Sequence, residues 1–162
     1  MESATDSAVG MLRHTVATLA YRGGKAMRGA PQDFSGFRIA ESSRTAGQIL
    51  AHIGDLLDWA LQLADARHEF RQTPPRTWGE DTNRFFAGLE ALERRLVSEE
   101  PLGFLPERLF QGPIADAFTH VGQISMLRRM AGSPVRGENY VKAEIMAGRV
   151  GAEQAIPVFE FD

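Results

Sequence analysis

Apolar residues recur every three or four positions in four long stretches of the chain, and this spacing places them on one face of a helix. Clusters of Gly, Pro and Ser, which end helices, separate the stretches. We expect helices over residues 5–27, 45–70, 78–98 and 113–132, with either Ser43 or Thr45 as the cap of the second. No window alternates apolar and polar residues for long enough to predict a sheet. The pattern therefore predicts an all-α fold, a four-helix bundle.

The connections between these stretches predict how the bundle is wired. Residues 28–44 form a connection that is long for a bundle, so we expect a crossover from one end to the other. Residues 103–112 form a connection with room for one short turn of helix. Residues 137–149 predict a further short helical stretch, and residues 155–162 an extended apolar tail packed on the bundle. A length of 162 residues suits a single domain, 1–162.

Composition narrows the classes of function. The net charge is -3 and the basic residues form no stripe, which argues against a nucleic-acid partner. No apolar run approaches the roughly 18 residues that span a bilayer, and the N-terminus does not read as a secretion signal, so we expect a cytoplasmic protein with no membrane partner. The chain has no cysteine, so any metal ion must take nitrogen and oxygen ligands.

Three polar residues of the fourth stretch, Asp116, His120 and Gln123, share one face at helical spacing. Together with Leu127 and Met130 they lie within a sector of about 80°, which the periodicity marks as core. Buried polar groups need partners. A metal ion bound by Asp116 and His120 is one way to provide them.

The second stretch offers a third ligand, His52, at the border of its apolar face. Trp59 occupies the same border and is expected to be a core or pocket-wall residue. An alternative needs no metal: Asp116 pairs with His120 or His52 as a buried hydrogen-bonded couple, and Gln123 completes the network. The residues alone leave both interpretations open.

A second apolar stripe, formed by Ile114, Phe118 and Val121, lies roughly opposite the Asp116 face. A helix with apolar residues all round is buried all round. Either a loop, the C-terminal tail or another subunit must cover this stripe, and a homodimer is the hypothesis that we carry.

Several segments resemble the DinB-like superfamily of small bacterial metal-binding four-helix bundles. They are residues 45–56 around His52, residues 116–128, the Gly-x-Asn-Tyr segment at 137–140 and Gly-Arg at 148–149. In that family a histidine of the second helix and a His-x-x-x-His-x-x-Gln motif of the fourth supply three metal ligands. The resemblance places His52, His120 and Gln123 at motif positions. Asp116 stands where the family usually has a histidine.

The resemblance implies a divalent ion (Zn, Ni, Mn or Fe) held by His52, Asp116 and His120, and the carboxylate shifts the preference toward harder metals. Gln123 would orient a ligand, and Tyr140 would line the pocket if the C-terminal segment folds over the bundle mouth. Related proteins include S-transferases that use low-molecular-weight thiols as cosubstrates. The expected function is therefore thiol transfer to a small molecule, or hydrolysis of one. The alternative is a non-catalytic stress-response or ligand-binding module that has lost its metal.

Overall fold

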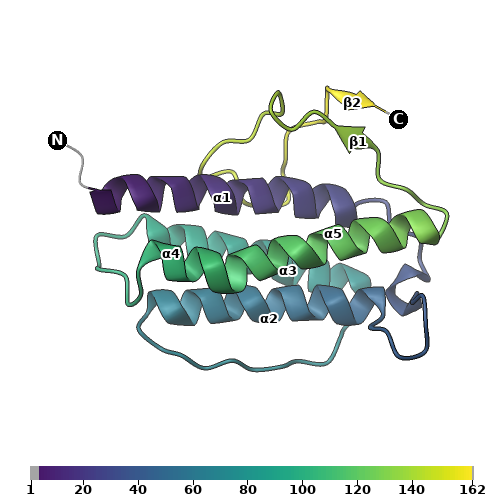
Figure 1. Ribbon diagram of the computed structural model, residues 1–162, viewed down its shortest axis with the longest axis horizontal. Helices are drawn as coiled ribbons and strands as arrows, with labels where there is room; N and C mark the ends of the chain where they lie inside the picture. Colours follow the sequence, from purple (N-terminus) through teal and green to yellow (C-terminus); the bar gives the residue numbers. More distant parts are fainter. Residues whose placement is uncertain (1–3, 162) are drawn as a thin grey trace.

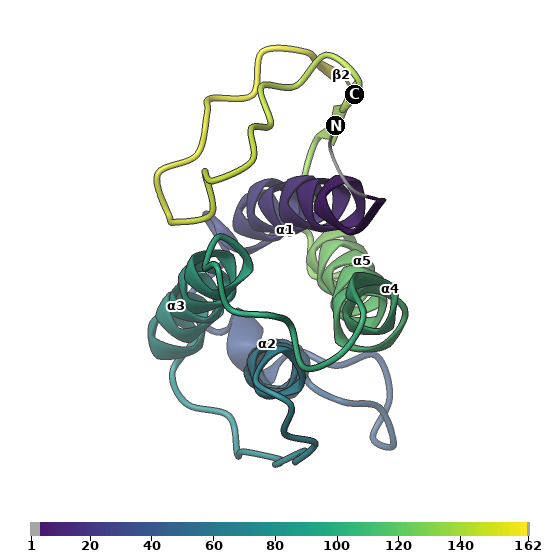
Figure 2. The same ribbon diagram turned by 90° about the vertical axis from the view of Figure 1, so that its left-hand side faces the viewer.

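The computed structural model describes residues 4–161 and confirms an all-α fold (Figure 1). The long helices are α1 (Ala4–Met27), α2 (Ala46–Ala64), α3 (Trp78–Leu96) and α5 (Ala115–Met130). Shorter helical segments are η1 (Phe34–Gly36), α4 (Pro106–Leu109) and η2 (Phe110–Ile114). The long helices lie side by side around a shared apolar core (Figure 2). Within residues 4–161, no helix is both long and apolar enough to cross a membrane.

Neighbouring helices α2 and α3 run in the same direction, which a short loop cannot achieve. Arg84 of α3 donates to the Ala51 carbonyl oxygen, and Arg95, further along α3, donates to the Ala64 carbonyl oxygen at the end of α2. Residues 65–77 connect the two helices by running back along the outside of α2 (Figure 1). Thirteen extended residues reach about 43 Å, enough to return along a 19-residue helix of about 28 Å.

The long crossover is therefore residues 65–77, and the prediction that residues 28–44 cross the bundle was wrong. Residues 28–44 begin and end at the same end of the bundle (Figure 1). Their length is used for packing, because Phe34 of η1 inserts into the core.

Helix α2 begins where the sequence predicts but ends six residues early. Thr45 caps it and Gln48 completes a capping box, as the spacing of these residues favours. At the other end, Gly103 and Arg95 both donate to the Ala64 carbonyl oxygen, and Ala66 adopts a positive φ of 59°. These bonds end the helix, so residues 67–70 are free to enter the crossover.

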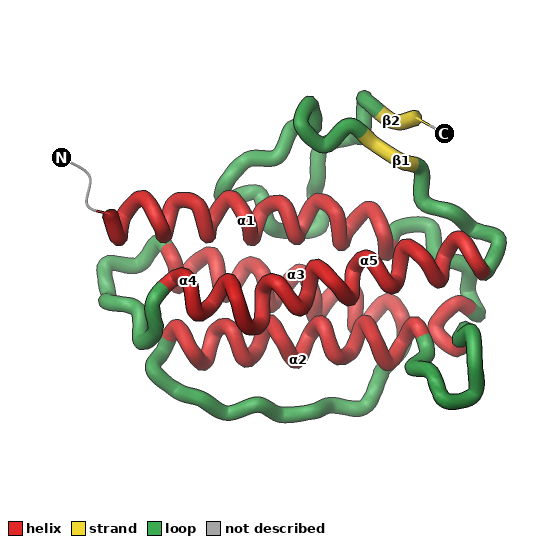
Figure 3. Tube along the Cα trace, in the orientation of Figure 1, coloured by secondary structure: helices red, strands yellow, loops and turns green. Residues whose placement is uncertain are grey.

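The fourth helical region begins at Pro106, seven residues before the predicted start. Segments α4, η2 and α5 follow one another without a break (Figure 3). Pro113 lies inside η2, which has π-helical geometry. Proline has no N–H to donate and its ring crowds the preceding turn, and a local π-turn is one way for a helix to accommodate such a residue.

The C-terminal segment is extended rather than helical, so the helix expected within residues 137–149 was wrong. Strand β1 (Gly137–Glu138) pairs antiparallel with β2 (Glu160–Phe161). The tail is extended as expected, but it is not packed through its apolar residues, because Ile156 is 82% and Val158 75% exposed. Polar contacts hold the segment on α1 instead: the buried carboxylate of Glu138 accepts from Tyr21 and Lys25.

Candidate metal centre

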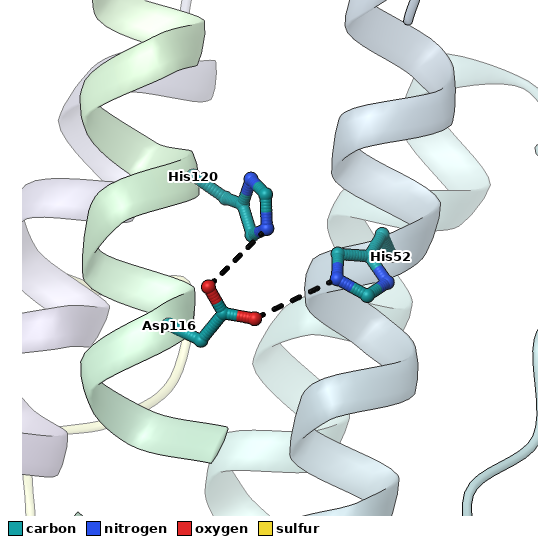
Figure 4. Close-up of side chains that lie close together, drawn as sticks. All are labelled: His52, Asp116 and His120. Carbon is teal, nitrogen blue, oxygen red and sulfur yellow. Dashed lines mark ion pairs between the residues drawn. The ribbon is translucent and has the colours of Figure 1, made fainter. Parts of the chain in front are cut away.

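His52 of α2 faces Asp116 and His120 of α5 (Figure 4). The His52 Nε2 atom lies 3.7 Å from Asp116 Oδ2, and His120 Nε2 lies 3.5 Å from Asp116 Oδ1. The two imidazole rings are 4.8 Å apart and almost perpendicular. One ligand atom from each residue lies within 4.8 Å of the other two. We call this group the metal triad, and it is the set of residues that the sequence singled out.

The metal triad lies at the edge of the bundle between α2 and α5, and the predicted core positions of Asp116 and Gln123 were wrong, because both side chains are exposed. The Asp116 side chain is 48% exposed, whereas those of His52 and His120 are 14% and 12% exposed. The buried face of α5 is a different one, lying roughly 110° around the helix axis from the polar trio. Its members in α5 are Ala117, Val121, Ile124 and Arg128, and Ile114 of η2 continues it, while Leu127 is the one residue on the side of the polar trio that is also buried.

This arrangement also removes the reason for expecting a second subunit on α5. Ile114 and Val121 are buried within the chain itself, and Phe118 packs against the same core. The apolar stripe opposite Asp116 is thus covered by the chain's own helices. The homodimer stays a prediction that these residues no longer support.

Gln123 fixes the orientation of His120. The His120 Nδ1 atom lies 2.9 Å from Gln123 Oε1, so Nδ1 carries the proton and donates it to the amide oxygen. The lone pair of the ring is then on Nε2, the atom that faces Asp116. Metal-binding histidines are commonly held through their other nitrogen in this way.

The surroundings of His52 favour its neutral form. Burial lowers its pKa, and the charges of His120 and Arg44 lower it further, whereas Asp116 and Asp55 raise it. Its Nδ1 atom is buried and has no hydrogen-bond partner among residues 4–161. A neutral imidazole is the form that binds metal.

The alternative of a buried hydrogen-bonded couple fits the geometry less well. The contacts of Asp116 with both histidines, at 3.5 and 3.7 Å, are longer than the usual hydrogen bond of 2.7–3.2 Å. Two ligands at about 2.1 Å from a tetrahedral ion lie about 3.4 Å apart. The two contacts of Asp116 are close to this value, but they end on different carboxylate oxygens, and the three ligand atoms lie within 4.8 Å of one another. Two imidazole nitrogens and a carboxylate oxygen also form a recognised donor set for divalent transition metals. The group can hold a metal ion.

No match emerged from comparisons with protein-family models, curated proteins or solved structures. The resemblance to the DinB-like superfamily therefore rests on the motif residues alone.

Two cavities border the metal triad on different sides. The polar cavity, of about 340 Å³, is lined by Arg44, Gln48, His52, Gln72 and Thr73 among others. The apolar cavity, of about 420 Å³, is lined by Ile39, Arg44, His120, Met126 and Met130 among others. Arg44 lines both. The sequence analysis did not predict Arg44 as a site residue. Its position directly before Thr45, the cap of the helix that carries His52, was the signal that could have indicated it.

The crossover brings a second unpredicted residue, Phe70, to the metal triad. Its ring contacts the ring of His52 at 5.9 Å between centroids. Trp59 packs against Phe70 and stacks on His68, so the Phe70 ring separates it from His52. Trp59 lines neither of the two cavities beside the metal triad. Thr73 anchors the same segment by donating through its hydroxyl to Asp55, at 2.6 Å.

Tyr140 does not take the predicted place at the pocket. Its ring packs edge-on against Tyr21 and beneath the guanidinium of Arg22, both on α1. The C-terminal segment covers the side of α1 that faces away from α2 (Figure 2). The segment therefore does not fold over the mouth of the site, because Glu138 fastens it to Lys25 and Tyr21.

Proposed function

We propose that this protein is a metal-dependent enzyme that acts on a small molecule, with a divalent ion held by His52, Asp116 and His120. The observation that carries the proposal is the meeting of three ligand atoms, from two facing helices, within 4.8 Å of one another. Two cavities of a size suited to small ligands lie directly beside them. A purely structural cluster needs no such access.

Membership of the DinB-like superfamily is part of the proposal. It is supported by the positions of His52, His120 and Gln123, which match the family motif and come together on facing helices. The carboxylate of Asp116 replaces a neutral ligand, so a bound ion would keep less of its charge and Zn, Mn, Ni and Fe would all be candidates.

The chain's own residues prepare the site for a nucleophile. A divalent ion in this position would lower the pKa of a bound thiol or water molecule and so provide a nucleophile at neutral pH. Asp116 is half exposed and keeps one side of the site open to an incoming molecule. Gln123 holds His120 in the orientation that presents Nε2.

Thiol transfer is favoured over hydrolysis by the state of the second carboxylate near the site. Asp55 lines the polar cavity, but its oxygens accept from Thr73 and Arg84, so it is not available as a general base. A thiol needs less assistance than water, because its pKa of about 8.5 already lies near neutrality.

The test is activity after reconstitution with each metal. Metal-free protein would be loaded with Zn²⁺, Mn²⁺, Ni²⁺ or Fe²⁺ and assayed for transfer of cysteine or glutathione to a chromogenic aryl halide. Hydrolysis of a nitrophenyl ester would be followed in parallel. We expect thiol transfer above the rate of free ion in buffer, and its loss in the His52→Ala/His120→Ala double variant.

The matched control is His14→Ala, because His14 is exposed on α1 and away from the metal triad. It should keep the wild-type rate. Protein that binds the ion and accelerates neither reaction would contradict the enzyme proposal and favour a non-catalytic binding module.

A further inference from the structure

The two cavities beside the metal triad differ in chemistry and share one cation. The polar cavity reaches His52 and the apolar cavity reaches His120 and Gln123. Arg44 lines both, so its side chain lies where a molecule spanning them would pass. A ligand at the metal triad can therefore present different groups to the two sides.

The Arg44 guanidinium is exposed and unpaired, and it borders both cavities. It makes no hydrogen bond or ion pair with any residue from 4 to 161, and its charge is felt at His52. Arg84, by contrast, is bound by Asp58 and by Asp55, a residue that lines the polar cavity. If a divalent ion were bound, the single negative charge of Asp116 would cancel only one of the two positive charges of the ion. Arg44 would add one more, so the site would attract an anion.

The apolar cavity exposes side chains that are usually buried. Ile39, Met126 and Met130 are each more than half exposed, and they gather beside His120. Methionine side chains adapt to ligands of different shape. A volume of about 420 Å³ falls within the range of small-molecule sites. An apolar arm would cover these side chains.

We infer that the substrate of this site is a small molecule with a carboxylate and an apolar arm. Arg44 binds the carboxylate, and the arm lies on Ile39, Met126 and Met130, which brings the molecule against the metal triad. This inference rests on the proposed function for the role of the metal, but the Arg44 and apolar contacts belong to the chain itself.

The test uses a series of simple probes: acetate, butanoate, hexanoate and octanoate, with hexanol and hexylamine as the uncharged and cationic counterparts of hexanoate. Binding to Zn²⁺-loaded and to metal-free protein would be measured by calorimetry. We expect the affinity of the carboxylates to rise up to about fourfold for each added methylene until the cavity is filled. Hexanoate should bind at least about tenfold more tightly than hexanol or hexylamine.

Two pairs of variants locate the binding. Arg44→Gln should weaken hexanoate binding about tenfold and leave hexanol unchanged, whereas Arg38→Gln, on the same connection but outside both cavities, should change neither. Met126→Ser should flatten the dependence on chain length, whereas Met11→Ser, an exposed methionine of α1, should not.

Metal content measured on the same samples separates the two proposals. Bound Zn²⁺ together with equal binding of hexanoate, hexanol and hexylamine would overturn the inference and leave the metal centre standing. Selective binding of hexanoate through Arg44 in protein that takes up no metal would keep the anion subsite and overturn the metal centre. Binding that persists unchanged in Arg44→Gln would also overturn the inference.

Discussion

Two polar clusters on opposite sides of the bundle combine acids with bases, and their geometry differs sharply. The Glu138 cluster, formed by Glu138, Lys25 and Tyr21, is closed: the Glu138 side chain is fully buried and its oxygens accept at 2.6 and 2.7 Å. The metal triad is open: the Asp116 side chain is 48% exposed and lies 3.5 and 3.7 Å from its histidines.

Under the proposed function, the difference is that between a structural cluster and a candidate binding site. Short hydrogen bonds to both carboxylate oxygens stabilise a buried charge, and they leave neither oxygen free to bind a ligand. Longer contacts among three groups that can all donate lone pairs leave room for a cation. We therefore expect changes in the Glu138 cluster to affect folding, and changes in the metal triad to affect metal binding.

The largest effect should come from breaking the Glu138 cluster. Lys25→Met leaves the Glu138 carboxylate buried without its cation and should lower the free energy of unfolding by about 3–5 kcal/mol. The midpoint of urea denaturation measures this loss. Lys142→Met, a change of the chain's other, exposed lysine, should cost less than about 1 kcal/mol. Loss of metal affinity in the Lys25 variant, with the fold intact, would contradict the claim that the Glu138 cluster affects folding and not metal binding.

A smaller effect should follow from changing Gln123. Gln123→Ala removes the acceptor that holds His120 and should weaken metal affinity about 10- to 100-fold. The stability of the metal-free protein should hardly change, because Gln123 is exposed. Competition with a chromogenic chelator measures the affinity. Gln123→Glu keeps an acceptor and should restore most of it; equal affinity in all three proteins would exclude the orienting role.

The smallest effect is on pH dependence. The pKa of His52 is lowered in the folded protein, chiefly by burial and then by His120 and Arg44, while Asp116 and Asp55 oppose the shift. The unfolded chain therefore binds more protons below about pH 6.5, and the metal-free protein loses stability as the pH falls through this range.

His52→Gln should flatten this decline, and the free energy of unfolding at about pH 7 and about pH 5 measures it. Arg44→Gln should raise the pKa of His52, which the NMR titration of its ring protons reports. A His52 pKa at or above the ordinary value in the wild type would contradict the account.

The sequence was sufficient to predict the four long helices and the close approach of His52, Asp116 and His120, whereas metal binding by these residues stays a prediction. Capping residues such as Thr45 and strong helical periodicity are local signals, so they predict a helix without information about which other elements it packs against. His52 and His120 could be paired because helices in a bundle bring their facing sides together.

The orientation of α5 could not be predicted because its core face contains a charged residue. Arg128 is buried, and it donates to the Ala26, Arg28 and Gly29 carbonyl oxygens at the end of α1. An analysis of apolar periodicity treats arginine as a surface residue. It therefore predicted that the face containing Asp116, rather than the face containing Arg128, packs against the core. Only the packing against α1 reveals that the guanidinium satisfies the end of another helix.

The crossover escaped prediction for a similar reason. Residues 65–77 carry little apolar periodicity, and their course is set by distant contacts: Phe70 against His52, and Thr73 with Asp55. The C-terminal segment is likewise held in place by the ion pair between Glu138 and Lys25 of α1. No local sequence pattern predicts a contact between residues so far apart in the chain.

The metal content of untagged protein, purified without chelator, tests the central claim most directly. Elemental mass spectrometry would compare the wild type with the His52→Ala/His120→Ala variant, with His14→Ala as control, before and after excess Zn²⁺, Mn²⁺ or Ni²⁺ is offered and removed. The account predicts about one ion per chain in the wild type and in His14→Ala, and its loss in the double variant. Equal traces of metal in all three proteins, even after loading, would contradict it.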